Sequence, residues 1–283
     1  PVYCGQKSEK EKFAGARATY SVEAMMQDGK ALQSGTSHNF GTNFSEPFEI
    51  KYLDKDGTQK YAHETSWGVS TRLIGAIIMT HSDNHGLVLP PVIAPTQVVV
   101  IPIAQHKEGV LEAAAGLRDR LTAAGIRVSM DDSDQSAGWK FAQYEMKGVP
   151  LRVEIGPKDM EKQQCCIARR DTGEKTFVPL SGLESAVQQL LRDVHDNLYA
   201  MAEKNLEDNT FDLNSWQEVK EMVETKGGFA RTKWCGKLEC ELKMKEEGGM
   251  SSRCMPLKQE HLGDTCPICG KPAKKMIYWG IAY

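Results

Sequence analysis

Several features that would narrow the class of this protein at once are missing from its sequence. No window of the 283 residues approaches the run of about 18 apolar residues that a membrane-spanning helix needs. The start of the chain has neither the basic region nor the apolar region of a signal peptide. Internal repeats and low-complexity tracts are absent. These absences predict a protein without a membrane partner.

A strong positive charge is also missing. The chain carries 35 Lys and Arg residues against 38 Asp and Glu residues, which gives a net charge of −3. This balance argues against a protein that coats nucleic acid through bulk electrostatics. A nucleic-acid partner would need a locally basic surface and recognition of shape.

The chain is longer than one ordinary domain, so more than one hydrophobic core is expected. Three stretches of the sequence also differ in composition and pattern. Residues 1–95 are rich in Gly, Thr, Ser, His and aromatic residues, and the alternating segment 48–53 is followed by an Asp56-Gly57 turn, which predicts antiparallel sheet. Residues 96–206 alternate strands with helices, as in a compact α/β domain. Residues 207–283 combine a short helix, a cysteine-bearing segment and a strand-like end. We therefore expect a mixed α+β and α/β fold with three domains.

Individual elements follow from periodicity and capping. The apolar segment 73–79 predicts a buried helix, and the Ser215–Glu218 pair predicts a capping box. The remaining predictions are strands over 98–101, 126–130, 149–155 and 276–283, and helices over 110–121 and 183–201.

Eight cysteines are present, and five of them lie between residues 235 and 269. Cys266 and Cys269 flank Pro-Ile, and Cys235 and Cys240 form a second pair. Two such pairs supply the four thiolates of a closed tetrahedral zinc site, which would be structural because no position is left for water. The alternative is a set of reduced core cysteines without metal. Cys254 lacks a partner and is expected to be a bystander. In a chain without a signal peptide, this clustering favours a reducing, cytoplasmic compartment.

Two segments of the first stretch have the composition of a ligand site. The hexapeptide 33–38 combines hydroxyls, one imidazole and small residues that let a ligand approach the backbone, although by itself it is also typical of ordinary turns. The segment 66–72 ends in an arginine at the start of an apolar helix. A guanidinium there suits a nucleotide, which offers an anion and a planar ring, or it pairs with a nearby carboxylate.

A third set of charges lies on turns beside the strands of the middle stretch, in the segments 147–150 and 156–159. Such side chains could hydrogen-bond the edges of bases, or they could form a solvated rim.

These segments resemble class II prolyl-tRNA synthetases of the archaeal and eukaryotic type, which also occurs in some bacteria. The segments 11–15 and 86–91, the cysteine pairs and the terminal Tyr283 match as well. The likeness runs through nearly the whole chain in the order of the family.

The resemblance implies an active site in residues 1–95, as the later part of the class II antiparallel catalytic sheet that ends in motif 3. The implied ATP-binding residues are Gln33, Thr36, Ser70 and Arg72, with Gln33 near Mg²⁺. The implied proline pocket consists of Phe13, His38, Ser66 and Gly68. His38 would position proline rather than act as a general base.

The resemblance also implies an anticodon-binding domain over 96–206. The residues that would face the guanines of the proline anticodon are Glu145, Arg152, Lys158 and Asp159. The implied substrates are L-proline, ATP and tRNA(Pro), and the implied ions are Mg²⁺ and a structural Zn²⁺.

One departure from the family concerns class II motifs 1 and 2, which do not occur in the sequence and would precede residue 1. The opening on Pro instead of Met also suggests that upstream residues are missing. Motif 1 builds the dimer interface and motif 2 supplies the arginine that grips the α-phosphate. We therefore expect a homodimer formed through the upstream part, and no prolyl-adenylate formation by residues 1–283 alone.

Two alternatives remain open. A non-catalytic tRNA-binding relative would keep the fold, although the presence of Arg72 and His38 disfavours it. A class II ligase for threonine or glycine would have a similar layout. Threonine enzymes bring zinc into the active site, whereas these cysteines lie in a separate C-terminal segment.

Overall fold

A computed structural model describes all residues from 1 to 283, and the backbone divides into two compact units. The first unit combines residues 1–76 with residues 203–283, and the second contains residues 77–202. The two ends of the chain therefore share one unit. The three-domain division by sequence remains a prediction.

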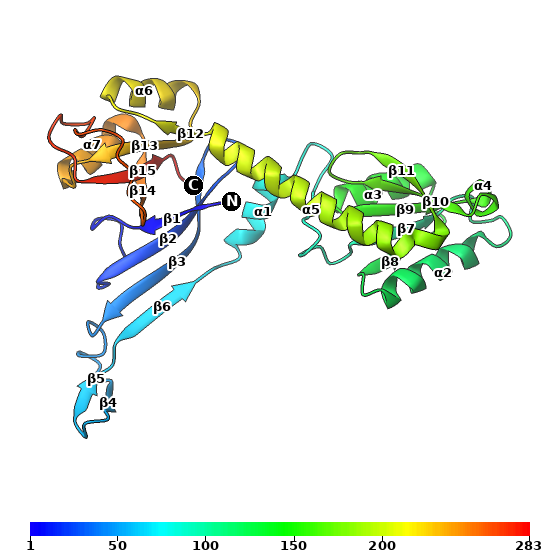
Figure 1. The fold of residues 1–283 in the computed structure, drawn as a ribbon, viewed down its shortest axis with the longest axis horizontal. Coiled ribbons are helices and arrows are strands. Elements are labelled where there is room, and N and C mark those ends of the chain that lie inside the picture. Colours follow the sequence, from blue (N-terminus) through cyan, green and yellow to red (C-terminus); the bar gives the residue numbers. More distant parts are fainter. The chain divides into compact units, whose positions relative to one another are not determined.

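The first unit is built on one eight-stranded sheet with the order β12-β13-β15-β14-β1-β2-β3-β6 (Figure 1). Its strands are β1 (Tyr3–Gln6), β2 (Ala18–Met25), β3 (Ala31–Gly41), β6 (Glu64–Gly68), β12 (Thr210–Asp212), β13 (Phe229–Trp234), β14 (Ser251–Pro256) and β15 (Lys275–Gly280). All neighbours pair antiparallel except β12 and β13.

The junction between the two ends of the chain is the β1–β14 pair, in which Gly5 lies opposite Pro256. A Cβ atom at Gly5 would stand 2.2 Å from the carbonyl oxygen of Met255. Only glycine fits this close approach of two backbones.

Beside this junction lies a buried ionic network centred on Glu23 of β2, whose side chain is fully buried. Lys7 donates to Glu23 Oε1 at 3.0 Å, and the Nε and Nη2 atoms of Arg253 donate to Glu23 Oε2 at 2.9 and 2.7 Å. A buried carboxylate is tolerated because two cations and three hydrogen bonds replace its water. The network links three parts of the sheet: Glu23 lies in β2, Lys7 directly follows β1, and Arg253 lies in β14.

The other elements of the first unit flank or extend this sheet. Helix α6 (Trp216–Thr225) begins with the predicted capping box of Ser215 and Glu218, and α7 (Leu238–Gly248) follows β13. Both helices contribute to a core around Trp279 of β15. The strands β4 (Lys51–Leu53) and β5 (Gln59–Tyr61) form a separate hairpin, which confirms the turn predicted at Asp56-Gly57.

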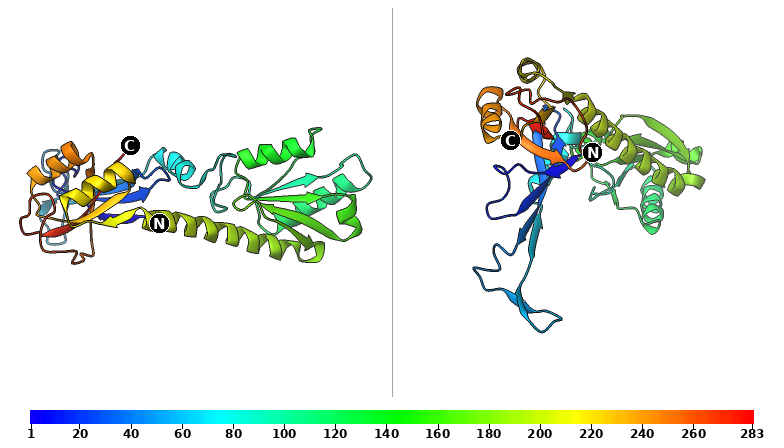
Figure 2. Two further views of the ribbon diagram at one scale, coloured as in Figure 1. Left: turned by 90° about the horizontal axis from the view of Figure 1, so that it is seen from above. Right: turned by 60° about the vertical axis from the view of Figure 1, so that its left-hand side comes forward.

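The second unit has a five-stranded sheet with the order β11-β10-β9-β7-β8 (Figure 2). Its strands are β7 (Val98–Pro102), β8 (Val128–Met130), β9 (Leu151–Ile155), β10 (Gln164–Arg169) and β11 (Lys175–Pro179). Strands β8, β7 and β9 are parallel, and β10 and β11 are antiparallel additions. Its helices are α2 (Val110–Ala123), α3 (Ala137–Met146), α4 (Pro157–Glu161) and the larger part of the 26-residue α5 (Leu183–Asp208), whose residues from 203 onward belong to the first unit.

The two faces of this second sheet are covered by different helices. Apolar residues of α2 and α5 pack on one face, against Val98, Val100 and Val153. Phe141 and Tyr144 of α3 pack on the other face, against Val99 and Ile101. Because β7 is buried on both faces, its sequence reads as the unbroken apolar run from which the strand was predicted.

The helices predicted from apolar stripes are present, including α1 (Arg72–His81). The prediction that α1 is buried was wrong, because only Ala76 of this helix is buried and Ile74 and Ile78 are exposed. None of the helices combines the length and the apolar character required to cross a bilayer.

The Glu23 network should control the stability of the first unit. Replacing Glu23 with alanine leaves Lys7 and Arg253 buried without a counter-charge, so we expect the free energy of unfolding to fall by about 3–5 kcal/mol. Urea unfolding followed by tryptophan fluorescence measures this, since four of the five tryptophans lie in the first unit.

The matched control is Lys204→Ala, which removes an exposed ion pair with Asp208 and should cost less than about 0.5 kcal/mol. Equal, small effects of the two substitutions would show that the buried network contributes little.

Candidate functional site

Polar side chains gather on one face of β3 and β6. The strand register places His38 opposite Ser66 and Thr36 opposite Gly68. Directly paired residues share a face of a sheet, as do residues two apart on one strand. The structure thus brings together four of the residues predicted from the sequence.

His38 is held rigidly on this face. Its Nδ1 atom lies 3.0 Å from the hydroxyl of Thr19 and its Nε2 atom lies 3.1 Å from the hydroxyl of Thr36. The ring of Phe13 is 4.9 Å from the imidazole, and the Phe13 backbone N–H donates to Thr19. A neutral imidazole has one donor and one acceptor, and here both are engaged. His38 is therefore suited to shape a pocket rather than to move protons.

Arg72 begins α1, as the sequence predicted, and its side chain reaches the same strand β3. Its Nη1 atom donates to the carbonyl oxygen of Gln33 at 3.3 Å, and its backbone N–H donates to the hydroxyl of Ser70 at 3.3 Å. Arg72 is exposed, and both hydrogen bonds run to uncharged groups. Its positive charge therefore remains available to an anion.

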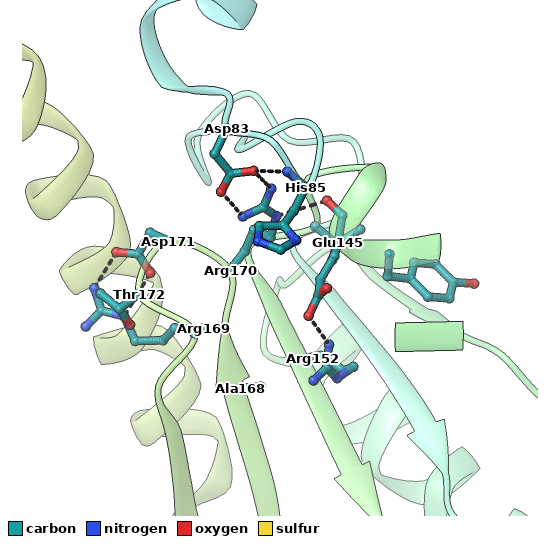
Figure 3. A pocket seen from close by; sticks show the side chains of 12 residues that line it. Asp83, His85, Glu145, Arg152, Ala168, Arg169, Arg170, Asp171 and Thr172 are labelled. Atoms are coloured by element: carbon teal, nitrogen blue, oxygen red, sulfur yellow. Dashed lines mark hydrogen bonds and ion pairs between the residues drawn. The ribbon is translucent and has the colours of Figure 1, made fainter. Parts of the chain in front are cut away.

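A separate pocket of about 280 Å³ lies in the second unit (Figure 3). Glu145 enters it from the end of α3, and Arg152 enters it from β9. Arg152 Nη1 is 3.4 Å from Glu145 Oε1, and Arg152 Nε donates to Glu154 at 2.9 Å. The Arg152 guanidinium also stacks 4.0 Å from the centre of the Phe141 ring. The pocket offers a carboxylate and a planar cation side by side.

The other two predicted residues of this group lie elsewhere. Lys158 and Asp159 belong to α4, which follows the carboxyl end of β9, whereas Arg152 is near the start of that strand. Asp159 accepts a hydrogen bond from the backbone N–H of Gly156 at 3.0 Å and so caps α4. The four residues grouped by the sequence thus form two separate pairs in the structure.

Sequence reasoning missed several residues of the pocket. Arg170, in the turn after β10, forms two hydrogen bonds of 2.7 Å with the carboxylate of Asp83. The hydrogen bonds from Arg170 lower the pKa of Asp83 to about 2. The two residues are 87 positions apart, and neither stands in a recognisable motif. Thr19 was missed for a related reason, because only the strand register places it opposite His38.

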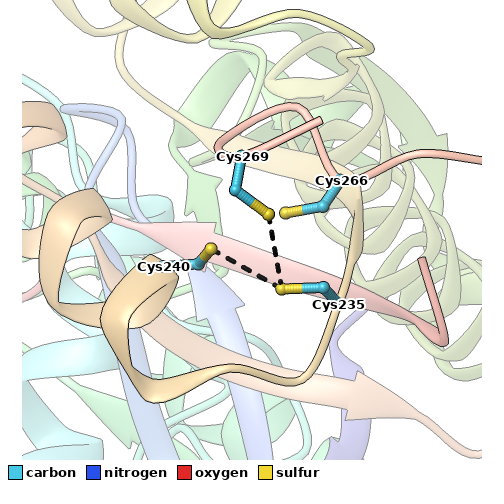
Figure 4. A group of neighbouring side chains, drawn as sticks. All are labelled: Cys235, Cys240, Cys266 and Cys269. Atoms are coloured by element: carbon cyan, nitrogen blue, oxygen red, sulfur yellow. Dashed lines mark hydrogen bonds between the residues drawn. The ribbon is translucent and has the colours of Figure 1, made fainter. Parts of the chain in front are cut away.

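The cysteine cluster is assembled as predicted (Figure 4). The ligand atoms of Cys235, Cys240, Cys266 and Cys269 all lie within 4.8 Å of one another. The sulfur atom of Cys235 lies 3.5 Å from that of Cys240 and 3.7 Å from that of Cys269. A tetrahedral zinc with bonds of about 2.3 Å requires separations of about 3.8 Å, so the cluster is compatible with zinc.

The ionisation of the clustered thiols depends on burial and on hydrogen bonds within the cluster. Burial raises the pKa of the Cys240 thiol, as it does that of Cys266. Burial opposes ionisation of Cys269 too, but hydrogen bonds from the Lys271 backbone and from the neighbouring thiols lower the pKa of Cys269 below its ordinary value. Four thiolates in this place would need a positive ion. Cys254 lies outside the cluster, in a different part of the core.

Comparison with known proteins gives the context of these sites. The family model described as "Anticodon binding domain" matches residues 97–190, and the one described as "Prolyl-tRNA synthetase, C-terminal" matches residues 216–283. A proline–tRNA ligase of Clostridium novyi is 56% identical over all 283 residues. Over its whole length the chain is similar to the C-terminal part of prolyl-tRNA synthetases. This result confirms the resemblance seen in the sequence.

Two further relatives give the same result. Proline–tRNA ligase of Ruminiclostridium cellulolyticum and proline–tRNA ligase 2 of Bacillus cereus are each 57% identical over the 283 residues. The chain spans 59% of the length of each of these three relatives. The segment 216–283, which the second family model matches, includes all four clustered cysteines.

The cluster predicts one zinc ion per chain. Elemental analysis of protein prepared without chelator should give one equivalent, and Cys269→Ser should reduce it, because three sulfurs hold the ion less tightly than four. Less than about one tenth of an equivalent in the unmodified chain would contradict the prediction.

The matched control is Cys254→Ala, which removes another buried cysteine. This variant should keep its zinc even if it is less stable. Equal zinc loss in both variants would show that the loss reflects unfolding and not ligation.

Proposed function

We propose that the chain forms the C-terminal part of a proline–tRNA ligase, which activates proline with ATP and transfers it to tRNA(Pro). The observation that carries this proposal is the 55–57% identity to proline–tRNA ligases over the whole chain. No observation favours the alternative of a non-catalytic relative, and both Arg72 and His38 stand on the polar face of the first unit.

We infer that β1, β2, β3 and β6 are the later strands of a class II catalytic sheet, with α1 as the helix of motif 3. Their antiparallel pairing supports this assignment, as does the position of Arg72 at the first residue of α1.

ATP would bind where β3 meets the start of α1. Arg72 would stack on the adenine ring and meet a phosphate, because a guanidinium offers both a planar face and a charge. Its bond to the Gln33 carbonyl directs it toward β3. The hydroxyls of Thr36 and Ser70 would add hydrogen bonds to the nucleotide. Gln33 would lie near Mg²⁺, whose charge neutralises the phosphates when it is bound.

Proline would bind on the same face, farther along β3 and β6. Its apolar ring suits the aromatic wall formed by Phe13, and Ser66 with Gly68 leaves room for a small ligand at the paired strand. His38 is fixed by Thr19 and Thr36 and would position the amino acid.

The chemistry that follows is an in-line displacement. The carboxylate of proline attacks the α-phosphorus of ATP, which releases pyrophosphate and leaves prolyl-adenylate. A ribose hydroxyl at the end of tRNA then attacks the prolyl carbonyl and displaces AMP. Because two anions must approach each other, positive charge and positioning supply the catalysis, and no side chain needs to act as a covalent nucleophile.

The second unit would bind the anticodon. A guanine base has hydrogen-bond donors on its Watson–Crick edge and acceptors at O6 and N7. Glu145 supplies the acceptor and Arg152 the donors within one pocket. Lys158 and Asp159, at the other end of β9, would contact a second anticodon base. This local recognition explains how a chain of net charge −3 can select one tRNA.

The remaining assignments complete the proposal. The cysteine cluster would hold a structural zinc, a homodimer would form through the part of the protein outside this chain, and the protein would act in the cytoplasm.

The active-site assignment predicts separate effects of two substitutions in the full-length ligase. Arg72→Ala should depress proline-dependent ATP–pyrophosphate exchange mainly through ATP, and His38→Ala mainly through proline. Loss of one good contact in a desolvated site costs about 2–4 kcal/mol, or roughly 30- to 1,000-fold in rate. Steady-state kinetics with each substrate varied in turn measures both effects.

Arg118→Ala is the control, since Arg118 pairs only with the neighbouring Asp119 on the surface of the second unit. The assignment is wrong if Arg72→Ala leaves ATP use unchanged, or if His38→Ala leaves proline use unchanged.

A further inference from the structure

The pocket of the second unit contains a buried arginine to which the proposed function gives no role (Figure 3). The side chain of Arg170 is only 6% exposed. Its Nη1 and Nη2 atoms donate to the two carboxylate oxygens of Asp83 at 2.7 Å, and its Nε atom donates to the backbone carbonyl of Glu145 at 2.9 Å. Arg170 therefore joins two segments that are distant in sequence and both line the pocket.

The Asp83 end of this contact is fixed by its own surroundings. Asp83 and Gly86 exchange backbone hydrogen bonds of 3.1 and 3.2 Å, and the Asp83 carboxylate accepts from the His85 backbone at 2.8 Å. The next residue, Leu87, donates to the carbonyl of Met146 at the end of α3. Gly86 has φ of 132°, and a Cβ there would lie 2.5 Å from the Cα of Met146. The turn 83–86 is thus laid closely on the last turn of α3.

The Glu145 end of the contact is the last turn of α3 itself. The carbonyl of Glu145 accepts from Arg170 and also from the backbone N–H of Gly148 at 3.0 Å. A cation is favourable at a helix C-terminus because the carbonyls there lack partners within the helix. The side chain of Glu145 is 43% exposed, so little packing restrains it. Two contacts therefore restrain where its carboxylate lies: the 3.4 Å contact of the carboxylate with Arg152, and the bond from Arg170 that fixes the backbone.

We propose that Arg170, held by Asp83, is a positioning residue that orients Glu145 for recognition of an anticodon base. This inference rests on the proposed function of the pocket. The bidentate bond to Asp83 neutralises the Arg170 charge, and its side chain is only 6% exposed, so Arg170 is poorly placed to bind a phosphate. Its contribution is to order Glu145 before the base arrives, which removes an entropy cost from binding.

The test compares two tRNA transcripts in the full-length ligase: tRNA(Pro), and the same transcript with one anticodon guanine replaced by adenine. Arg170→Ala should raise KM for tRNA(Pro) by roughly 10- to 100-fold, because a recognition group that is misplaced by about 1 Å loses most of its contacts. The preference for guanine over adenine should shrink by a similar factor. Asp83→Asn should act in the same direction. ATP–pyrophosphate exchange, which needs no tRNA, verifies that each variant is folded.

The matched control is Arg120→Ala. Arg120 also forms a bidentate pair, with Glu184 at 2.8 and 2.9 Å, and also donates to a backbone carbonyl, that of Leu180 at 2.7 Å. It belongs to the same unit but does not line the pocket. This variant should leave both KM for tRNA and the base preference unchanged. Equal effects of Arg120→Ala and Arg170→Ala would overturn the proposal in favour of general destabilisation.

Salt dependence separates positioning from direct phosphate binding. If Arg170 bound a phosphate, its removal would weaken the binding of both transcripts equally. It would also reduce the dependence of affinity on salt concentration. Positioning predicts an unchanged salt dependence, so a reduced one would overturn the inference.

The variants Glu145→Ala and Arg152→Ala distinguish failure of the proposed pocket function from failure of the role of Arg170. If both spare tRNA use, the proposed function of the pocket fails. If both impair it while Arg170→Ala does not, only the role of Arg170 fails.

Discussion

The first unit depends on the two ion pairs that the buried carboxylate of Glu23 forms. Lys7 and Arg253 meet it from sequence positions 16 and 230 residues away, and they do so where β1 and β14 join the two ends of the chain. On one side of this junction, β3 and β6 carry the polar face with His38. On the other side, β15 follows the segment with Cys266 and Cys269. A structural ion in the cysteine cluster would therefore stabilise the same sheet that carries the proposed active site.

In both units, neighbouring residues hold the side chain that is proposed to meet a ligand. In the first unit, hydroxyls of Thr19 and Thr36 hold His38 before any ligand binds. In the second, Phe141 and Glu154 hold the guanidinium of Arg152. In each case the group that would meet the substrate is ordered by neighbours that do not. Such preorganisation reduces the entropy cost of binding. It would also allow a chain with no overall positive charge to recognise RNA through local geometry.

Elements with a strong local signal could be predicted from the sequence, and contacts between distant segments could not. The apolar run of β7, the capping box of Ser215 and the spacing of Cys266 and Cys269 each reflect a rule that acts over a few residues. The union of residues 1–76 with 203–283 in one sheet depends on the β1–β14 pairing, for which the sequence has no local signal. The same limit hid the Asp83–Arg170 contact. Arg152 and Lys158, which the family resemblance assigned to one anticodon site, lie toward opposite ends of β9.

The central claim is that this chain belongs to a ligase specific for proline. It is tested most directly by ATP–pyrophosphate exchange in the full-length protein with proline, threonine and glycine supplied one at a time. The account predicts exchange that depends on proline and is at least about 100-fold weaker with the other two, because each lacks the ring that the Phe13 wall would contact. Equal or stronger exchange with threonine or glycine would contradict the assignment of the amino acid. Absence of exchange with all three, in a folded protein that still binds tRNA(Pro), would contradict the claim that the protein is a ligase.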